Sequence, residues 1–343
     1  MYRLAAVLTA AFVAVGLGAG AATARPIDAY CSLPEALGVS RFQSIDTTGG
    51  PRFGLQFQPE GTSFLAPGEV VLTFDDGPYA PTTGAILDTL DRFCTKATFF
   101  AVGRLALSQQ ETLKSLVSRG HTLGGHTWAH ANLSALGVDR RAVEVEKGFS
   151  ALSEIVGPHV APFFRFPYLT HPEAELERLS KRNVAVFAID IDSTDSHGQH
   201  VSGERIVSQT LKQLEMRGKG IILLHDLKSN TAKALPALLQ ALKEKGYRIV
   251  HIVPAAPFEP NAAFSAEVAE KVIEKAQTKV AANTAVPARR QAAKPVVLKA
   301  SRNVGKGRTA RQRSTAGDDK LRKGKRGKHS KVEAKNGPFR RSI

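Results

Sequence analysis

Two adjacent carboxylates stand where an apolar run meets a turn. Asp75 and Asp76 follow the run at residues 70–74 and precede Gly77-Pro78. At the end of a buried strand, one carboxylate can bind a cation while the other stays free to accept a proton. Asp-Asp-Gly-Pro is also favourable turn chemistry, so this pair alone does not separate a catalytic site from a simple turn.

Two histidines supply the second part of a possible metal site. His126 and His130 are four positions apart, and on a helical turn both imidazoles would point the same way, as ligands of one divalent ion must. Most histidines at this spacing are surface or core residues. With one carboxylate from another strand end they make three protein ligands and leave a coordination position open for water or substrate. The set predicts a site for one first-row divalent cation.

Further polar residues follow later apolar runs. Arg165 closes one run, Asp195 lies in the acidic stretch at 190–195, and His225 closes another. Taken alone, Arg165 is typical of a surface cation and His225 of a hydrogen-bonded core histidine. Active sites of parallel barrels are built at the carboxyl ends of the strands, and all these residues fall at or just after such ends. Their shared placement predicts one active site.

The elements that would position these residues alternate between two types. Seven short apolar runs are expected to be strands, at residues 70–74, 97–101, 121–124, 163–166, 184–189, 221–224 and 248–253. Amphipathic segments lie between them, at residues 109–119, 140–155, 173–181, 204–216 and 232–245. Repeated βα units imply a parallel sheet, so the sequence predicts an α/β fold, a distorted (β/α) barrel of about seven parallel strands. An open doubly wound sheet is the alternative.

The segments before this region have different compositions. Residues 1–24 combine a basic start, an apolar run and Ala22-Thr23-Ala24, which predicts a cleaved signal peptide rather than an uncleaved anchor. Residues 25–65 are expected to be an irregular segment that packs against the catalytic domain at 66–255. Cys31 and Cys94 are the only cysteines, and in an oxidising compartment they would form either one disulfide or two free thiols.

The C-terminal region carries the whole net charge of +16. Residues 261–343 hold 22 Lys and Arg against 6 Asp and Glu, and have few large apolar side chains. We expect a disordered basic tail there, with a transient helix at 263–282. It would be either a solvated spacer or an electrostatic attachment to anionic envelope material. The tail lacks the aromatic residues of a base-stacking surface, so no specific nucleic acid partner is expected.

The chain contains five motifs in the order Thr73-Phe74-Asp75-Asp76-Gly77, His126-Thr127-Trp128-Ala129-His130, Arg165-Phe166-Pro167-Tyr168, Asp192-Ser193-Thr194-Asp195 and Leu223-Leu224-His225. Together they resemble the motifs of the polysaccharide deacetylases with nodulation-protein-B homology, carbohydrate esterase family 4. The resemblance covers residues 68–253.

The resemblance implies a role for each residue. Asp76, His126 and His130 would hold one divalent ion, most often Zn²⁺, with Co²⁺ or Ni²⁺ as alternatives. Asp75 would be the general base and His225 the general acid. Arg165 would orient the base, and Asp195 would position the acid. The backbone N–H of Tyr168 would stabilise the oxyanion, and Leu223 would line the acetyl pocket.

The sequence departs from the common family pattern at two positions. Leu169 stands where a Gly often follows the Pro-Tyr pair, which would alter the sugar groove. Ser196 stands where an aromatic residue, usually Trp, often follows the second Asp, which would remove one wall of the acetyl pocket.

Together these features predict an exported enzyme, in the periplasm, cell envelope or medium, with no transmembrane helix after signal cleavage. Its reaction would be hydrolysis of N-acetyl groups on a GlcNAc-containing glycan, such as peptidoglycan, chitin oligomers or poly-GlcNAc. The alternatives are an O-acetyl xylan esterase and a non-catalytic glycan-binding protein of the envelope.

Overall fold

A computed structural model describes residues 34–198 and 201–284 of the chain. Within this part, ten strands form one sheet in which every pairing is parallel. The strands are β1 (Arg41–Ile45), β2 (Arg52–Phe53), β3 (Glu69–Asp75), β4 (Thr98–Ala101), β5 (Thr122–Gly125), β6 (Val160–Phe164), β7 (Ala185–Phe187), β8 (Ile191–Asp192), β9 (Gly220–His225) and β10 (Arg248–Pro254).

The strand pairings close the sheet into a barrel. From β3 the pairing passes through β4, β5 and β6 to β7, and the same segment continues as β8, which pairs with β9. β9 in turn pairs with β3 along Val70 to Asp75, so the ring is complete. The α/β barrel is therefore confirmed, and the open sheet is excluded. All seven expected strands are present.

The last strand, β10, lies outside the ring. It pairs with β3 only at Glu69 and Val70, where β3 begins, and pairs with β1 along its length. The hydroxyl of Thr122, at the start of β5, donates to the backbone oxygen of Ile252 at 2.7 Å. β10 thus reaches the strand starts, at the end of the barrel opposite the strand ends where Asp75 and His225 lie.

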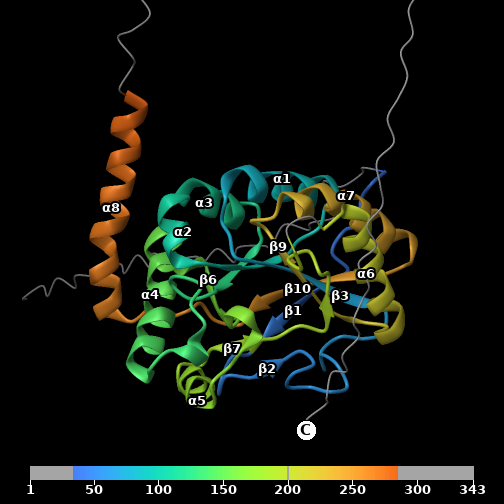
Figure 1. The fold of residues 1–343 in the computed structure, drawn as a ribbon, viewed down its shortest axis with the longest axis horizontal. Coiled ribbons are helices and arrows are strands. Elements are labelled where there is room, and N and C mark those ends of the chain that lie inside the picture. Colours follow the sequence, from blue (N-terminus) through green and yellow to red (C-terminus); the bar gives the residue numbers. More distant parts are fainter. Residues whose placement is uncertain (1–33, 199–200, 285–343) are drawn as a thin grey trace, which may run out of the picture. The chain divides into compact units, whose positions relative to one another are not determined.

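Helices surround the barrel wall, and the last of them lies outside this layer (Figure 1). They are α1 (Ala80–Arg92), α2 (Gly103–Ser108), α3 (Gln110–Ser118), α4 (Val138–Val156), α5 (Glu173–Lys181), α6 (Gly203–Arg217), α7 (Ser229–Glu244) and α8 (Ala262–Thr284). The last helix, α8, lies against α4. Five of the helices match the amphipathic segments expected from the sequence. Among the described residues, no helix is long and apolar enough to cross a membrane.

Two apolar cores follow from the alternation of side chains along each strand. Leu72 and Phe74 of β3 pack outward against helices, in a core shared with α1 and α4, whereas Val71 points into the barrel. On β6, Phe164 faces the helices and Phe163 faces the barrel interior. Because the pattern alternates, Thr73 and Asp75 share the inner face with Val71.

The segment before the barrel differs from expectation. Its described part contributes two strands instead of an irregular lead-in: β1 pairs with β10 and β2 pairs with β7. Thr62 donates to the buried Asp190 carboxylate at 2.6 Å, and the Phe53 and Phe187 rings lie 5.1 Å apart. The short strands escaped detection because their two to five residues carry no sustained alternation.

The region after residue 260 is more ordered at its start than expected. A disordered tail with a transient helix at 263–282 was expected, and the structure has the helix α8 over Ala262–Thr284, packed against α4. Val268 of α8 is fully buried, and Lys147 of α4 forms an ion pair with Glu267 at 2.6 Å. The small apolar residues of this helix find a partner surface on α4, which composition alone does not reveal. The signal peptide, Cys31 and residues 285–343 lie outside the described residues.

Candidate active site

Strand alternation brings the site residues to one end of the barrel. Asp75 ends β3 and His225 ends β9, in register with each other in the parallel pair. Arg165 follows β6 by one residue, on the inner face set by Phe163. The carboxyl ends of these parallel strands therefore carry a carboxylate, an imidazole and a guanidinium toward the same space inside the barrel.

Arg165 holds Asp75 from inside the barrel. The Arg165 side chain is fully buried, and its Nη1 donates to Asp75 Oδ1 at 2.8 Å and to Thr73 Oγ1 at 2.7 Å. Its other nitrogens donate to the backbone oxygens of Phe187, at 3.0 Å, and Ala188, at 3.1 Å. Burial lowers the pKa of Arg165 and the charge of Asp75 opposes this. With one oxygen held in this way, Asp75 Oδ2 remains for other contacts.

Asp76, His126 and His130 form a compact group of possible ligands. One oxygen or nitrogen from each lies within 4.8 Å of the others. Asp76 Oδ1 is 3.5 Å from His126 Nε2 and 3.1 Å from His130 Nε2. The expected helical turn at 126–130 is wrong: Thr127 and His130 have φ of 65° and 58°, and this loop bends back so that the rings lie 4.9 Å apart.

The tautomer of His126 is fixed by its backbone partner. Its Nδ1 lies 2.7 Å from the main-chain oxygen of Arg165, which can only accept, so Nδ1 carries the proton. In the neutral ring, Nε2 then presents a lone pair toward Asp76 Oδ1, an oxygen that is buried without a hydrogen-bond partner. Two acceptors face each other, which is the arrangement a bound cation stabilises.

Asp76 is a carboxylate at neutral pH. Burial raises the pKa of Asp76, and its contacts with His126 and His130 lower it by more, so its pKa lies well below the usual carboxyl range. The donor set fits a first-row divalent cation, since it offers one carboxylate oxygen and two imidazole nitrogens.

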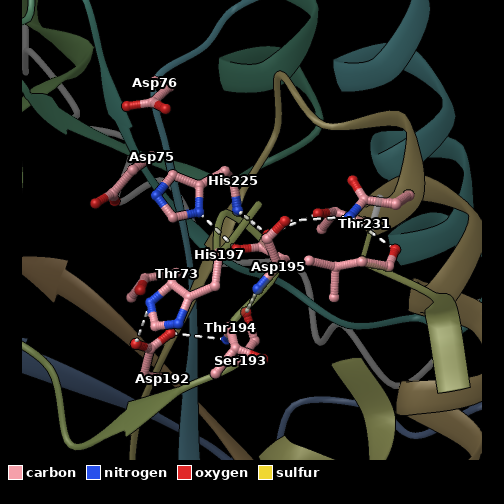
Figure 2. A network of polar contacts seen from close by, with 12 residues as sticks. Thr73, Asp75, Asp76, Asp192, Ser193, Thr194, Asp195, His197, His225 and Thr231 are labelled. Atoms are coloured by element: carbon pink, nitrogen blue, oxygen red, sulfur yellow. Dashed lines mark hydrogen bonds and ion pairs between the residues drawn. The ribbon is translucent and has the colours of Figure 1, made fainter. Parts of the chain in front are cut away.

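His225 is held by the buried carboxylate of Asp195, which follows β8, the strand paired with β9 (Figure 2). Its Nδ1 lies 2.7 Å from Asp195 Oδ1, and its backbone N–H donates to Asp195 Oδ2, also at 2.7 Å. Thr231 donates to the same Oδ2 at 2.6 Å. Burial lowers the pKa of His225, but Asp195, together with the charges of Asp75 and Asp76, raises it to about 9. The imidazole is therefore protonated at neutral pH.

These residues border a cavity of about 400 Å³. Seven of the nine residues expected at the site line it: Asp75, Asp76, His126, His130, Tyr168, Leu223 and His225. Arg165 and Asp195 lie behind this surface and contact Asp75 and His225. The expected site residues are thus brought together.

The two departures from the family pattern both border the cavity. Ser196 lines it, and beside it His197 Nε2 lies 3.2 Å from Asp192 Oδ2, so this wall is polar (Figure 2). Leu169 has φ of 54°, in the left-handed region that favours glycine, as does Tyr168 with φ of 59°. The Tyr168 ring packs against His130 at 4.8 Å.

Some contributors were missed from the sequence. Thr231 and Thr73 complete the hydrogen bonds of Asp195 and Arg165, and Lys228 lines the cavity. Thr73 was quoted in a motif without a role. Thr231 and Lys228 lie beyond the last motif and show no spacing signal.

Comparison with known proteins identifies the family. The family model described as polysaccharide deacetylase matches residues 65–187. The solved structure of the Bc1960 peptidoglycan N-acetylglucosamine deacetylase is similar, with 30% identity and a TM-score of 0.50, covering 55% of this chain and 86% of that one. The chain belongs to the polysaccharide deacetylase family. The expected family resemblance is confirmed.

Two other members of this deacetylase family are also similar. The peptidoglycan deacetylase Bd3279 of Bdellovibrio bacteriovorus matches at 33% identity with a TM-score of 0.58, over 66% of this chain and 62% of that one. A chitin deacetylase of Arthroderma benhamiae is 30% identical over 190 residues, 54% of this chain and 51% of that protein. The chain thus spans about half the length of curated relatives that it matches.

Proposed function

We propose that this protein hydrolyses the N-acetyl groups of a GlcNAc-containing glycan and releases acetate. The observation that carries the proposal is the placement of a carboxylate and an imidazole at one cavity, each held by a buried side chain of opposite charge. Asp75 is held by Arg165 on one side, and His225 is held by Asp195 on the other. The Asp76, His126 and His130 group lies beside them in the same cavity.

The proposed metal would be bound by Asp76 Oδ1 and the Nε2 atoms of His126 and His130. A divalent cation there, most often zinc in this donor set, would polarise the acetyl carbonyl and make a nearby water more acidic. The hydrogen bond from His126 to the Arg165 backbone would hold the first imidazole in its ligating tautomer.

Asp75 is proposed as the general base. Its Oδ1 accepts from Arg165, and its Oδ2 lies 4.0 Å from His126 Nε2, on the side of the proposed cation. From there it would take a proton as the water oxygen bonds to the acetyl carbon. Proton transfer of this kind contributes about 10²- to 10⁴-fold to rate.

His225 is proposed as the general acid. An amide nitrogen leaves poorly unless it is protonated, and the Asp195 carboxylate at Nδ1 favours the protonated form of the His225 imidazole that would supply this proton. As the carbon–nitrogen bond breaks, Nε2 would give its proton to the sugar nitrogen. Acetate and a free amine result. The Tyr168 N–H is proposed to stabilise the negative oxygen formed in between, and Leu223 to contact the acetyl methyl group.

The glycan is proposed from relatives. The similar proteins are named as deacetylases of peptidoglycan, of its N-acetylglucosamine, and of chitin. Peptidoglycan is our first candidate, with chitin oligomers and poly-GlcNAc next. An O-acetyl esterase is the second candidate function, favoured by one observation: the polar wall of Ser196 and His197 in place of an aromatic residue.

The test is a release assay. The protein, loaded with zinc, is incubated with peptidoglycan fragments, chitohexaose, a poly-GlcNAc oligomer and acetylated xylan, and free acetate is measured. We expect release from the N-acetylated glycans and loss of release in Asp75→Asn. Release from acetylated xylan alone would replace the proposal with the esterase. If the metal-loaded protein releases acetate from none of these substrates, the interpretation as a non-catalytic glycan-binding protein would remain.

Export to the envelope or medium is part of the proposal, since the named substrates of the relatives include a wall polymer. The basic residues after Thr284 are proposed to bind anionic envelope material. Residues 285–343 hold 19 Lys and Arg against 3 Asp and Glu, a net charge of +16.

A further inference from the structure

Asp226 is a buried carboxylate that the proposed reaction does not use. It follows His225 at the end of β9 and is 1% exposed. Both carboxylate oxygens are engaged inside the protein: Oδ1 accepts from the Gly77 N–H at 2.8 Å, and Oδ2 accepts from Thr83 Oγ1 at 2.6 Å. We propose that Asp226 is a positioning residue that holds the β3–α1 turn in the shape that presents Asp75 and Asp76.

The main chain of Asp226 contacts the same turn. Its N–H donates to the Asp75 backbone oxygen at 3.1 Å, and its own oxygen accepts from Thr82 Oγ1 at 2.6 Å. One residue therefore bonds to the end of β3, to the turn and to the first residues of α1. These bonds fasten the strand of the proposed acid, His225, to the strand of the proposed base.

The bond to Gly77 acts on the conformation of Asp76. Asp76 has φ of 80°, a region that L-residues adopt only where their surroundings impose it. The N–H of Gly77 lies in the peptide plane that joins it to Asp76, so a fixed N–H fixes the rotation of that plane. Through this hydrogen bond, Asp226 sets the direction in which the Asp76 side chain points, which is toward His126 and His130.

The space at Gly77 is already filled by Asp226. A Cβ added at Gly77 would overlap both carboxylate oxygens of Asp226. The turn and the carboxylate are therefore complementary in shape as well as in hydrogen bonding. Glycine at this position leaves room for the side chain that holds the turn.

The inference rests on the proposed function only in that Asp76, His126 and His130 bind a metal ion. Its readouts are zinc affinity, measured by competition with a chromophoric chelator, and the visible spectrum of bound Co²⁺, which reports ligand geometry. Asp226→Ala is expected to weaken zinc binding about 10- to 100-fold, the range found for residues that orient metal ligands, and to change the Co²⁺ spectrum. Asp226→Asn keeps an oxygen acceptor for Gly77 and is expected to retain near-native affinity.

A double-mutant cycle tests the contact itself. Gly77→Ala should weaken zinc binding because its Cβ displaces Asp226. In the Asp226→Ala background the same change should have little further effect, because the space is free. Equal, additive losses in the two backgrounds would overturn the direct coupling. Thr89→Val is the matched control: it removes a buried hydroxyl that bonds to Ala85 at 2.9 Å in the same helix, and should leave zinc affinity unchanged.

If Asp226→Ala does not fold, Thr83→Val gives the milder test, since it leaves the Asp226 carboxylate in place, removes the partner of Oδ2 together with the acceptor of the Tyr79 N–H, and should weaken zinc binding several-fold. The proposal is overturned if folded Asp226→Ala binds zinc with native affinity and an unchanged Co²⁺ spectrum, or if the native protein binds no metal. If the native protein binds zinc but releases no acetate, the proposed function fails while the role of Asp226 is still decided by these measurements.

Discussion

The backbone of Arg165 orients His126, while its side chain holds Asp75. His126 Nδ1 donates to the Arg165 oxygen at 2.7 Å, and Arg165 Nη1 donates to Asp75 Oδ1 at 2.8 Å. The proposed metal ligand and the proposed base therefore share one neighbour, through separate atoms. A side-chain substitution at Arg165 separates the two contacts.

Arg165→Lys should lower turnover far more than metal affinity. Lysine keeps the backbone oxygen that His126 needs but cannot reproduce the four donor contacts of the guanidinium. We expect a fall in kcat of at least tenfold, zinc affinity within a few-fold of native, and a loss of about 3 kcal/mol in the free energy of unfolding. Kinetics, chelator competition and urea unfolding measure the three effects. Equal losses in affinity and turnover would contradict the separation.

Asp75→Asn and Asp76→Asn should have different effects although the residues are adjacent. Asp75→Asn removes the proposed base and should keep the metal while lowering kcat about 10²- to 10⁴-fold. Asp76→Asn removes a charged ligand and should weaken metal binding itself. Elemental analysis beside kinetics separates the two. Equal metal loss in both variants would show that the division of roles is wrong.

His126→Ala should remove both metal and activity, because it deletes a ligand whose tautomer the protein has fixed. His159→Ala is the matched control, since His159 is exposed and lies just before β6, away from the strand ends. Zinc content after dialysis should be near zero in the first variant and native in the second. Full occupancy in His126→Ala would rule out its assignment as a ligand.

Acid should destabilise the fold through two buried histidines near the start of β5. Burial and the nearby charge of Lys96 lower the pKa of His251 to about 4, and burial lowers the pKa of His121 well below its usual value. Below about pH 6.5 these two histidines bind protons in the unfolded chain but not in the folded chain, so their contribution to the free energy of unfolding falls as pH drops. For His251 alone the loss approaches about 3 kcal/mol near pH 4.

His251→Gln provides the measurement for this effect. A glutamine can still donate to Thr122, which lies 3.1 Å from His251 Nε2, but does not titrate. The free energy of unfolding is measured in urea at pH 7, 6 and 5. The deficit of the variant relative to the native protein should be largest at pH 7 and should shrink as pH falls. A constant difference across this range would mean that His251 does not contribute.

Deletion of residues 285–343 should separate attachment from catalysis. The cut follows α8, because Val268 is buried in the core and a cut at 261 would remove that helix. Turnover on chitohexaose should be nearly unchanged. Binding of the full chain to purified envelope should fall as salt rises, since ions screen exposed charges beyond about 10 Å at 0.1 M. If the full and truncated proteins sediment equally with purified envelope at low salt, the attachment role is excluded and the spacer interpretation remains.

The sequence predicted the barrel and the site residues for identifiable reasons. The runs at 70–74 and 221–224 are apolar, β-branched and bounded by turns, so their strands were detectable, and polar residues at their ends marked the site. The path from His126 to His130 was not predictable, because it depends on left-handed residues at Thr127 and His130. The spacing of four residues suggested a helical turn, but a loop brings the two imidazoles together instead.

Contacts between distant segments were also beyond the sequence. Thr231 bonds to Asp195 across 36 positions, and Asp226 bonds to Gly77 across 149. Neither pair has a local signal, because each depends on which strands become neighbours. The strands β1 and β2 were missed because they have only five and two residues, too few for a sustained alternation.

The segment before the barrel limits how this chain can be recombined with a relative. Thr62 hydrogen-bonds the buried Asp190, and the Phe53 ring packs against Phe187, so residues 34–65 contribute buried contacts to the barrel that the later strands close. A chimera that exchanged only residues 66–255 with a relative would leave a buried carboxylate without its hydroxyl partner and an aromatic face open to water. A segment exchanged with a relative should therefore extend beyond the stretch that carries the five motifs and include the two strands before it.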